Sequence, residues 1–458
     1  MNHTQILASF AANLHFEQIP LEVVKRTEDF FLDWFGSALA GRGARPVKLI
    51  HKFAVTQGPQ SGTSEVLISR RTASPLFAAM VNAAASHFAE QDDLHNSSVF
   101  HPATVVFPVA WAVAQALGSS GKEFIAASVV GYEVGIRVGE FLGQSHYKIF
   151  HTTGTVGTIA AAAAVGTLLR LNDKQMVHAF GSAGTQAAGL WEFLRDAADS
   201  KQLHTAKAAA NGLTAAYLAA DGFTGANDIF EGAQGMGAGM STETYPEKLV
   251  DRLGTRWALS ETSFKFHASC RHTHPAADAL LQVLKRERLT SGDIESVVTH
   301  VHQAAIDVLG PVTDPKTIHQ AKFSMGTVLA LAAEYGHAGV REFDDHHSES
   351  RIAQFRDKVS MIFDPEIDNA YPTRWIGKVT VRLKDGRTFE GRVDDPKGDP
   401  GNTLSRAELE RKAIALGLYG NAATEDEIRT AIASVWSITE APIVTRLLPE
   451  PPQENQHA

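Results

Sequence analysis

The sequence predicts a mainly α-helical protein with a large helical domain and a smaller α+β domain. Apolar residues recur at spacings of three and four through about the first 260 residues, which is the period of helices that bury one face. After about residue 265 the pattern changes, because short segments with alternating β-branched residues are interleaved with helical ones. With 458 residues, 44% of them hydrophobic, the chain can form two or three domains with cores of their own.

The first domain is predicted to be a tightly packed set of helices. Residues 120–123 (Ser-Gly-Lys-Glu) form a capping-box pattern, which marks the start of a helix. Alanine-rich faces at residues 160–164 and 206–210 allow neighbouring helices to approach closely. The helices expected from the apolar spacing cover residues 20–40, 75–87, 107–117, 122–142, 155–171, 174–184 and 205–220.

The second domain is predicted to combine a small sheet with helices. Residues 294–302 alternate as a strand does, and residues 377–393 read as two strands joined at Asp385-Gly386, a strong hairpin signal. The polar loop 394–402 marks a boundary, and the proline-rich tail from Pro449 is predicted to be disordered. Further helices are expected at residues 275–286, 323–334, 405–418 and 424–435. Periodicity alone leaves open whether the last two return to the first domain.

Composition and charge argue against several classes of protein. A formal net charge of −9 offers no basic surface for nucleic acid. A single cysteine fits a reducing compartment, and residues 1–13 are too polar and too poor in basic residues for a signal or transit peptide. The longest apolar stretch, residues 157–169, is shorter than the roughly 20 residues that cross a bilayer. We therefore expect a cytoplasmic protein that binds neither nucleic acid nor a membrane.

The only cysteine lies in a run suited to acid–base chemistry. Residues 269–275 read Ser-Cys-Arg-His-Thr-His-Pro, so that a thiol, a guanidinium group and two imidazoles are neighbours in the chain. A lone thiol cannot form an internal disulfide, whereas these groups could bind and deprotonate a small acid. The run could instead be a polar loop that enters the helix at residues 276–286.

A second cluster combines carboxylates and imidazoles after a predicted helix. Residues 90–95 read Glu-Gln-Asp-Asp-Leu-His, and His101 follows. This composition could hold a hydroxyl group, a water molecule or a divalent cation. Neither His-Glu-x-x-His nor the spacing of a calcium loop is present, so we predict no metal. In the structural alternative, Asp92 or Asp93 caps a turn and His101 begins a helix.

Two further segments offer an anion site and a base. His151 precedes Thr-Thr-Gly-Thr at the start of an alanine-rich helix, where hydroxyl and backbone N–H groups can bind a carboxylate. A plain N-cap is the alternative. Lys207 lies among small apolar residues, where partial burial would lower its pKa and make it a base. Its amine could also extend out of a buried helix. Residues 320–325 are predicted to be a loop at a domain junction.

Missing motifs narrow the chemistry. The chain has no Gly-x-Ser-x-Gly elbow, no Rossmann glycine fingerprint after a strand and no Cys-x-x-Cys pair. These absences weaken the cases for a hydrolase, a dehydrogenase and a structural zinc protein. Acid–base chemistry without an organic cofactor remains, in which a histidine, lysine or thiolate removes a proton from carbon while cations hold carboxylates.

Seven segments follow one another along the chain: Asp92-Asp93, His101-Pro102, His151 before Thr-Thr-Gly, Leu203-His204 with Lys207, and residues 270–274, 320–324 and 396–400. In this order they resemble the MmgE/PrpD family, and the resemblance covers nearly the whole chain. Members include 2-methylcitrate dehydratase, cis-aconitate decarboxylase and iminodisuccinate epimerase. The resemblance implies a homodimer that requires no metal. It also implies a helical domain formed by residues 1–266 and 403–448, with the α+β domain 267–402 inserted and 449–458 as the tail.

Departures from the family pattern favour one activity. Members that act on citrate-like acids carry threonine where this chain has Leu94, and decarboxylases carry lysine at the position of Ala210 and histidine at that of Cys270. We therefore predict a cofactor-independent epimerase that exchanges the α-proton of an amino- or imino-dicarboxylate of the iminodisuccinate type. The alternative is a lyase on a tricarboxylate, of the 2-methylcitrate dehydratase or cis-aconitate decarboxylase type. A non-catalytic metabolite-binding protein is the third possibility.

The predicted site draws on both domains. Stereoinversion needs a proton-carrying group on each face of a planar carbanion. Lys207 is expected to move the proton together with His151 or Cys270. The residues expected to bind the substrate are His101, Asp93, Lys265, Arg271, His272 and His274.

Overall fold

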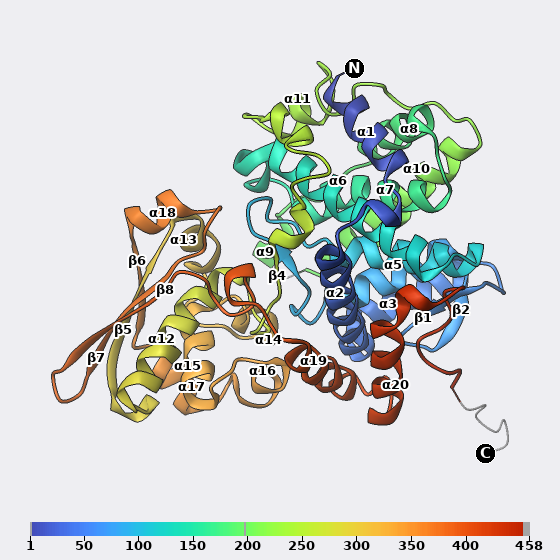
Figure 1. The fold of residues 1–458 in the computed structure, drawn as a ribbon. Coiled ribbons are helices and arrows are strands. Elements are labelled where there is room, and N and C mark those ends of the chain that lie inside the picture. Colours follow the sequence, from blue (N-terminus) through green and yellow to red (C-terminus); the bar gives the residue numbers. More distant parts are fainter. Residues whose placement is uncertain (1, 197, 452–458) are drawn as a thin grey trace. The chain divides into compact units, whose positions relative to one another are not determined.

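The structure is a computed structural model that describes residues 2–196 and 198–451, and helices dominate it (Figure 1). This confirms the predicted mainly α class. The chain divides into two compact units: unit 1 is residues 1–262 with 405–458, and unit 2 is residues 263–404. Most of the tail predicted to be disordered, residues 452–458, lies outside the described residues.

Unit 1 is a helical assembly built around one buried helix, α7. All but one of its residues are buried, because small side chains let α6 and α10 pack closely on it. The helices of unit 1 are α1 (His3–Asn13), α2 (Leu21–Ala40), α3 (Arg45–Gln57), α4 (Pro75–Ser86), α5 (Ala103–Leu117), α6 (Gly121–Tyr147), α7 (Thr152–Leu168), α8 (Asp173–Gly184), α9 (Phe193–Asp196), α10 (Ser200–Ala220), α11 (Met236–Met240), α19 (Arg406–Tyr419) and α20 (Glu425–Trp436). Its short strands are β1 (Ser64–Val66), β2 (Arg71–Ala73) and β3 (Leu94–His95).

The capping box predicted at residues 120–123 is confirmed. Ser120 accepts a hydrogen bond from the backbone N–H of Glu123, whose carboxylate accepts in return from the Ser120 N–H at 2.8 Å. The cap fixes the start of α6, the longest helix among the described residues.

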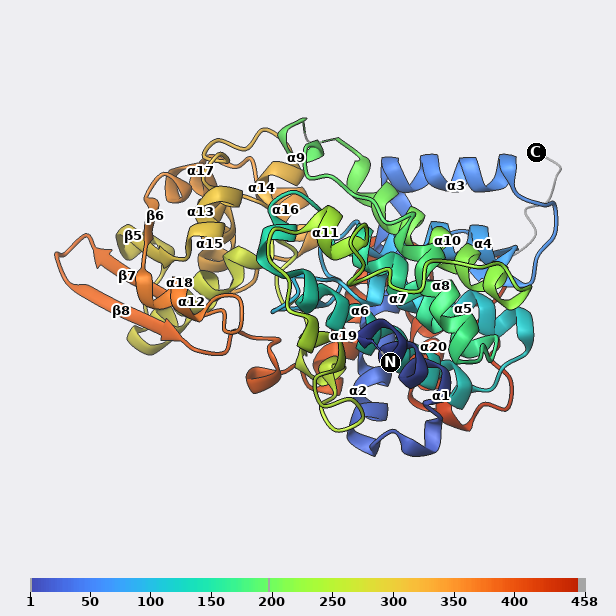
Figure 2. The same ribbon diagram turned by 90° about the horizontal axis from the view of Figure 1, so that it is seen from above.

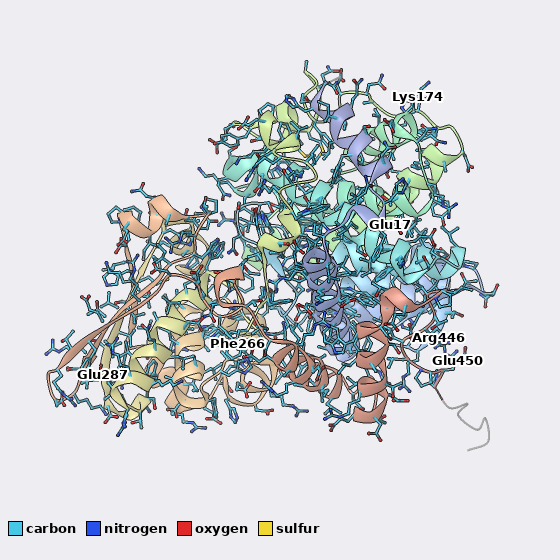
Figure 3. All side chains as sticks on the ribbon, in the orientation of Figure 1. Glu17, Lys174, Phe266, Glu287, Arg446 and Glu450 are labelled. Carbon is cyan, nitrogen blue, oxygen red and sulfur yellow. The ribbon has the colours of Figure 1, made fainter. Side chains whose placement is uncertain are left out.

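The last helices of the chain pack within unit 1. Lys412 on α19 forms an ion pair of 2.6 Å with the buried Asp33 of α2. Further along, the backbone N–H groups of Leu447 and Leu448 both donate to the buried carboxylate of Glu65. On either side of these two leucines in the chain, Arg446 and Glu450 form an ion pair of 2.7 Å, and Figure 3 labels both. The start and the end of the chain therefore share one core.

Unit 2 is a four-stranded sheet with helices, in the order β6-β5-β7-β8. Strands β5 and β6 are parallel, and the other pairs are antiparallel. The predicted hairpin at Asp385-Gly386 is confirmed between β7 and β8, where Gly386 has a φ of 89°. The strands are β5 (Ile294–Val301), β6 (Val359–Phe363), β7 (Gly377–Leu383) and β8 (Thr388–Val393). The helices are α12 (His274–Glu287), α13 (Gln303–Leu309), α14 (Ile318–Ala321), α15 (Met325–Tyr335), α16 (Val340–His346), α17 (Ser350–Arg356) and α18 (Pro365–Ala370).

One predicted loop is wrong in part. Residues 320–325 include the end of α14 and the start of α15, and Ser324 is the N-cap residue of α15. The side chain of Ser324 accepts from the N–H of Thr327 at 3.4 Å, so this polar residue starts a helix rather than a longer loop. Across residues 2–196 and 198–451, no helix is long and apolar enough to span a bilayer.

Candidate active site

Four imidazoles, two of them buried and two partly buried, gather in unit 1 where the ends of several helices meet. His87 directly follows α4, and His101 lies just before α5. His151 is the residue before α7, and His204 lies near the start of α10. Ring centroids are 4.9 Å apart for His87 and His101, 5.4 Å for His87 and His151, and 5.4 Å for His151 and His204. We call these four residues the imidazole cluster.

Asp92 connects two of these imidazoles. Its Oδ2 atom accepts from Nδ1 of His87 at 2.7 Å and lies 3.2 Å from Nδ1 of His101. Nδ1 of His101 also lies 2.6 Å from the carbonyl oxygen of Asp93, which can only accept. In the neutral rings, Nε2 is therefore the nitrogen that can take up a proton. Among the described residues, neither Nε2 of His87 nor Oδ1 of Asp92 has a hydrogen-bond partner, although both atoms are buried.

Burial and charge give the two neighbouring aspartates different pKa values. Burial opposes ionisation of Asp92, but His87 and His101 outweigh it and hold the Asp92 pKa well below its ordinary value. Burial raises the pKa of Asp93 well above its ordinary value, although Tyr132 donates to Oδ2 at 2.7 Å. Burial also lowers the pKa of His87 to about 4. An ionised Asp92 thus orients a neutral His87, as a carboxylate orients a base.

His151 and His204 form the other half of the cluster. Their Nδ1 atoms lie 3.2 Å apart, so one ring donates to the other. Gly189, with a φ of 151°, lets the backbone pass close to both, and its carbonyl oxygen accepts from the His151 N–H at 2.8 Å. Trp191 packs against His151 with 4.7 Å between ring centroids. Burial lowers the pKa of His151 well below its ordinary value and that of His204 to about 4, so both are neutral at pH 7.

Lys201 is a site residue that the motifs did not single out. Its side chain is buried and forms an ion pair with Glu90. Burial is the main cause of the low pKa values of His87, His151 and His204, and the charge of Lys201 lowers all three further. The apolar spacing predicts a helix only from residue 205, whereas α10 begins at residue 200. The sequence therefore gave no sign that this lysine belongs to the inward face of a helix.

Lys207 occupies a different environment on the same helix. It is exposed, in contrast to the partly buried lysine predicted. Six residues beyond Lys201, it is rotated roughly 120° around the helix axis. It lines a mainly apolar pocket of about 470 Å³ with side chains that include Phe53 and Phe77. Phe53 belongs to α3, which runs along the outer edge of unit 1 (Figure 2). Lys207 thus lines this apolar pocket, whereas Lys201 acts on the imidazole cluster.

The predicted cations of unit 2 are buried and largely paired. Arg271 forms an ion pair with Asp399, which also accepts from Ser263. Nη1 of Arg271 lies 3.4 Å from Nδ1 of His274. Burial, with the charges of Arg271 and Lys265 among others, lowers the pKa of His274 well below its ordinary value. Within unit 2 the charge of Arg271 is therefore balanced by a carboxylate.

Cys270 is a buried thiol held by backbone contacts. Its N–H donates to the carbonyl oxygen of Lys322 at 2.9 Å, and its carbonyl accepts from the hydroxyl of Thr273 at 2.7 Å. Burial, followed by the charge of Cys270, raises the pKa of Tyr371, so the phenol lies near the thiol.

His272 lies against His302 and Trp375, two residues that no sequence motif indicated. The structure thus gathers Asp93, His101 and His151 in unit 1, and Lys265, Cys270, Arg271, His272 and His274 in unit 2.

One group in the cluster has the composition of a metal site. The ligand atoms of His87, Asp92 and His101 lie within 4.8 Å of one another. However, the His87 and Asp92 atoms are 2.7 Å apart, the distance of a hydrogen bond. Two atoms bound to a tetrahedral zinc ion at about 2.0–2.1 Å would be about 3.3 Å apart. Nδ1 of His87 and Oδ2 of Asp92 therefore share a hydrogen bond, and they lie too close together to bind one tetrahedral zinc ion between them.

A second acidic group in unit 1 already holds a cation of the protein. His95, Glu140 and Glu261 also lie within 4.8 Å of one another. Arg256 pairs with Glu140 at 2.7 Å and with Glu261 at 2.6 Å. The guanidinium group therefore balances both carboxylates in place of an ion.

Two family models together match most of the chain. The MmgE/PrpD N-terminal domain matches residues 5–248, and the MmgE/PrpD C-terminal domain matches residues 267–438. The chain belongs to the MmgE/PrpD family. This confirms the family predicted from the motifs.

Relatives in this family match the chain over most of its length. The cis-aconitate decarboxylase-like protein oryM of Aspergillus oryzae is 28% identical over 87% of each chain. A cis-aconitate decarboxylase of Aspergillus terreus is 26% identical, over 97% of this chain and 95% of its own length. The cis-aconitate decarboxylase of Mus musculus is 27% identical, over 98% of this chain and 95% of its own length.

These relatives overturn the predicted isomerase. They are named as decarboxylases, which are lyases, and none of them is an epimerase. The prediction gave too much weight to single positions. Ala210, for example, lines the same apolar pocket as Lys207.

Proposed function

We propose that this MmgE/PrpD protein is a lyase that decarboxylates a small tricarboxylate of the cis-aconitate type. The observation that carries the proposal is its similarity to cis-aconitate decarboxylases over nearly the full length of both chains. The imidazole cluster supports it, because together with Lys201 and Asp92 it supplies neutral bases, a lysine and an oriented carboxylate at one place. A homodimer in the cytoplasm is part of the same proposal.

The reaction requires an electron pair to be stabilised and one proton to be added. Loss of carbon dioxide from the saturated arm of cis-aconitate breaks a C–C bond. The electron pair then spreads over the double bond onto a neighbouring carboxylate. A proton added at the far carbon gives an unsaturated five-carbon dicarboxylate. The enzyme must therefore hold negative charge and supply one proton at a defined carbon.

The imidazole cluster can supply that proton once a substrate is bound. Burial keeps His87 and His204 neutral, with pKa values of about 4. A bound tricarboxylate brings negative charge, which favours the protonated form and raises these pKa values. One of the four imidazoles would then be the acid, and Lys201 would hold a carboxylate.

The test is to incubate the protein with cis-aconitate in deuterium oxide and to follow the mixture by proton NMR and mass spectrometry. The expected result is release of carbon dioxide and a five-carbon product with one carbon-bound deuterium. The same assay with 2-methylcitrate tests the dehydratase alternative, and the appearance of its dehydrated product would overturn the proposal. Binding of cis-aconitate without any turnover would favour a metabolite-binding protein and would also overturn it.

A further inference from the structure

A buried imidazole nitrogen in unit 2 has no hydrogen-bond partner. His272 lies next to Cys270, and only 4% of its surface is exposed. Among the described residues, nothing accepts from or donates to its Nε2 atom. Leaving such an atom without a partner is unfavourable, so it is a natural contact for a ligand. What it can contact depends on whether this nitrogen carries the proton.

A chain of hydrogen bonds decides the position of that proton. The N–H of Ala305 donates to Nδ1 of His302 at 3.3 Å, so this nitrogen is an acceptor. In the neutral ring the proton of His302 is then on Nε2, which lies 3.4 Å from Nδ1 of His272. Nδ1 of His272 therefore accepts, and Nε2 of His272 carries the hydrogen.

Aromatic rings hold both imidazoles in place. His302 stacks on Tyr371 with 3.8 Å between centroids and 11° between planes. His272 stacks on Trp375 with 4.8 Å between centroids and 22° between planes. His302 is also the N-cap residue of α13, so a helix N-terminus fixes its orientation. The direction of the His272 Nε2–H bond is thus set by the fold.

We propose that His302 is a positioning residue that keeps His272 in the Nε2–H form, so that His272 donates a hydrogen bond to a carboxylate or carbonyl oxygen of the substrate. The substrate class rests on the proposed lyase function, whereas the proton position does not. A neutral donor suits this place because the charge of Arg271 beside it is already paired with Asp399. It can bind an oxygen without adding a further buried charge.

The test uses a matched pair of variants at residue 302. His302→Gln keeps an acceptor for Ala305 and a donor for Nδ1 of His272. His302→Glu has nearly the same shape but offers an acceptor to Nδ1 when ionised. Nitrogen-15 NMR of histidine-labelled protein distinguishes the protonated ring nitrogen, and the His272 signals are assigned by their loss in His272→Asn. We expect Nε2–H in the native protein and in His302→Gln, and Nδ1–H in His302→Glu.

Kinetics give a second readout. With cis-aconitate, His302→Glu should raise KM about tenfold relative to His302→Gln, because one donor to the substrate is lost. His302→Phe, which keeps the stacking on Tyr371, replaces His302→Glu if the latter does not fold, and it should leave the His272 proton unfixed. An Nδ1–H signal in the native protein, or equal KM values in the matched pair, would overturn the proposal. If cis-aconitate is not turned over, the lyase function fails while the NMR result still decides the proton position.

Discussion

The imidazole cluster of unit 1 and the Cys270 segment of unit 2 both bury several titratable groups, but they leave different atoms without partners. In unit 1, Nε2 of His87 and Oδ1 of Asp92 are acceptors without a donor among the described residues. In unit 2, Nε of Arg271 and Nε2 of His272 are donors without an acceptor there. On the proposed function, the first region would supply the proton and the second would bind oxygen atoms of the substrate. Chemistry and recognition can thus be changed separately.

The largest expected effect distinguishes two lysines of one helix. Lys201→Met should lower kcat/KM for cis-aconitate by about 10³-fold, because it removes the buried cation proposed to hold a carboxylate of the substrate. Lys207→Met is the control and should stay within about twofold, because this lysine lines the apolar pocket. Steady-state kinetics on both variants checks this. An equal loss of kcat/KM in both variants would contradict the inference that Lys201 belongs to the site and Lys207 does not.

Acid tests a property that the two regions share, the neutrality of their imidazoles. Burial lowers the pKa of His87 from 6.5 to about 4, so the unfolded chain binds a proton more readily than the folded one. Stability is therefore complete above about pH 6.5 and falls as the pH decreases toward 4, by about 3 kcal/mol for this residue. Thermal unfolding between pH 4 and 7 should show the fall. His87→Gln should make it smaller, and an unchanged slope would mean that His87 is not buried in the neutral form.

Asp92→Asn tests the orientation of the base and should have a smaller effect. The amide can no longer hold His87 as the carboxylate does, so kcat should fall about 10²-fold with little change in KM. Asp399→Asn in unit 2 should instead act mainly on KM, because Asp399 pairs with Arg271. A fall in kcat of the same size in both variants would contradict the division between proton transfer and binding.

Local patterns predicted much of the fold because their causes are local. The capping box at Ser120 and the hairpin turn at Gly386 depend on residues a few positions apart. The site was harder to predict, because its partners are distant in the chain. Lys201 pairs with Glu90 across 111 positions, and His272 meets His302 across 30. No short motif encodes these contacts, so the motifs singled out His101 and His151 as candidates but did not indicate Lys201 or His302.

The error about the reaction had a related cause. Leu94, Ala210 and Cys270 differ from the family pattern, and these three positions alone decided the choice between the activities. Leu94 is buried in a short strand, and Ala210 lines a pocket on another face of α10. A substitution changes chemistry only where its side chain reaches the reacting groups, and that cannot be read from the order of residues.

The shared core of unit 1 has a consequence for synthesis on the ribosome. Asp33 of α2 forms its ion pair with Lys412, and Glu65 accepts hydrogen bonds from the N–H groups of Leu447 and Leu448. These partners are translated only after all of unit 2. During synthesis the carboxylates of Asp33 and Glu65 must therefore stay exposed to solvent or chaperones until these partners emerge. Unit 2 is complete before that point and is free to fold first.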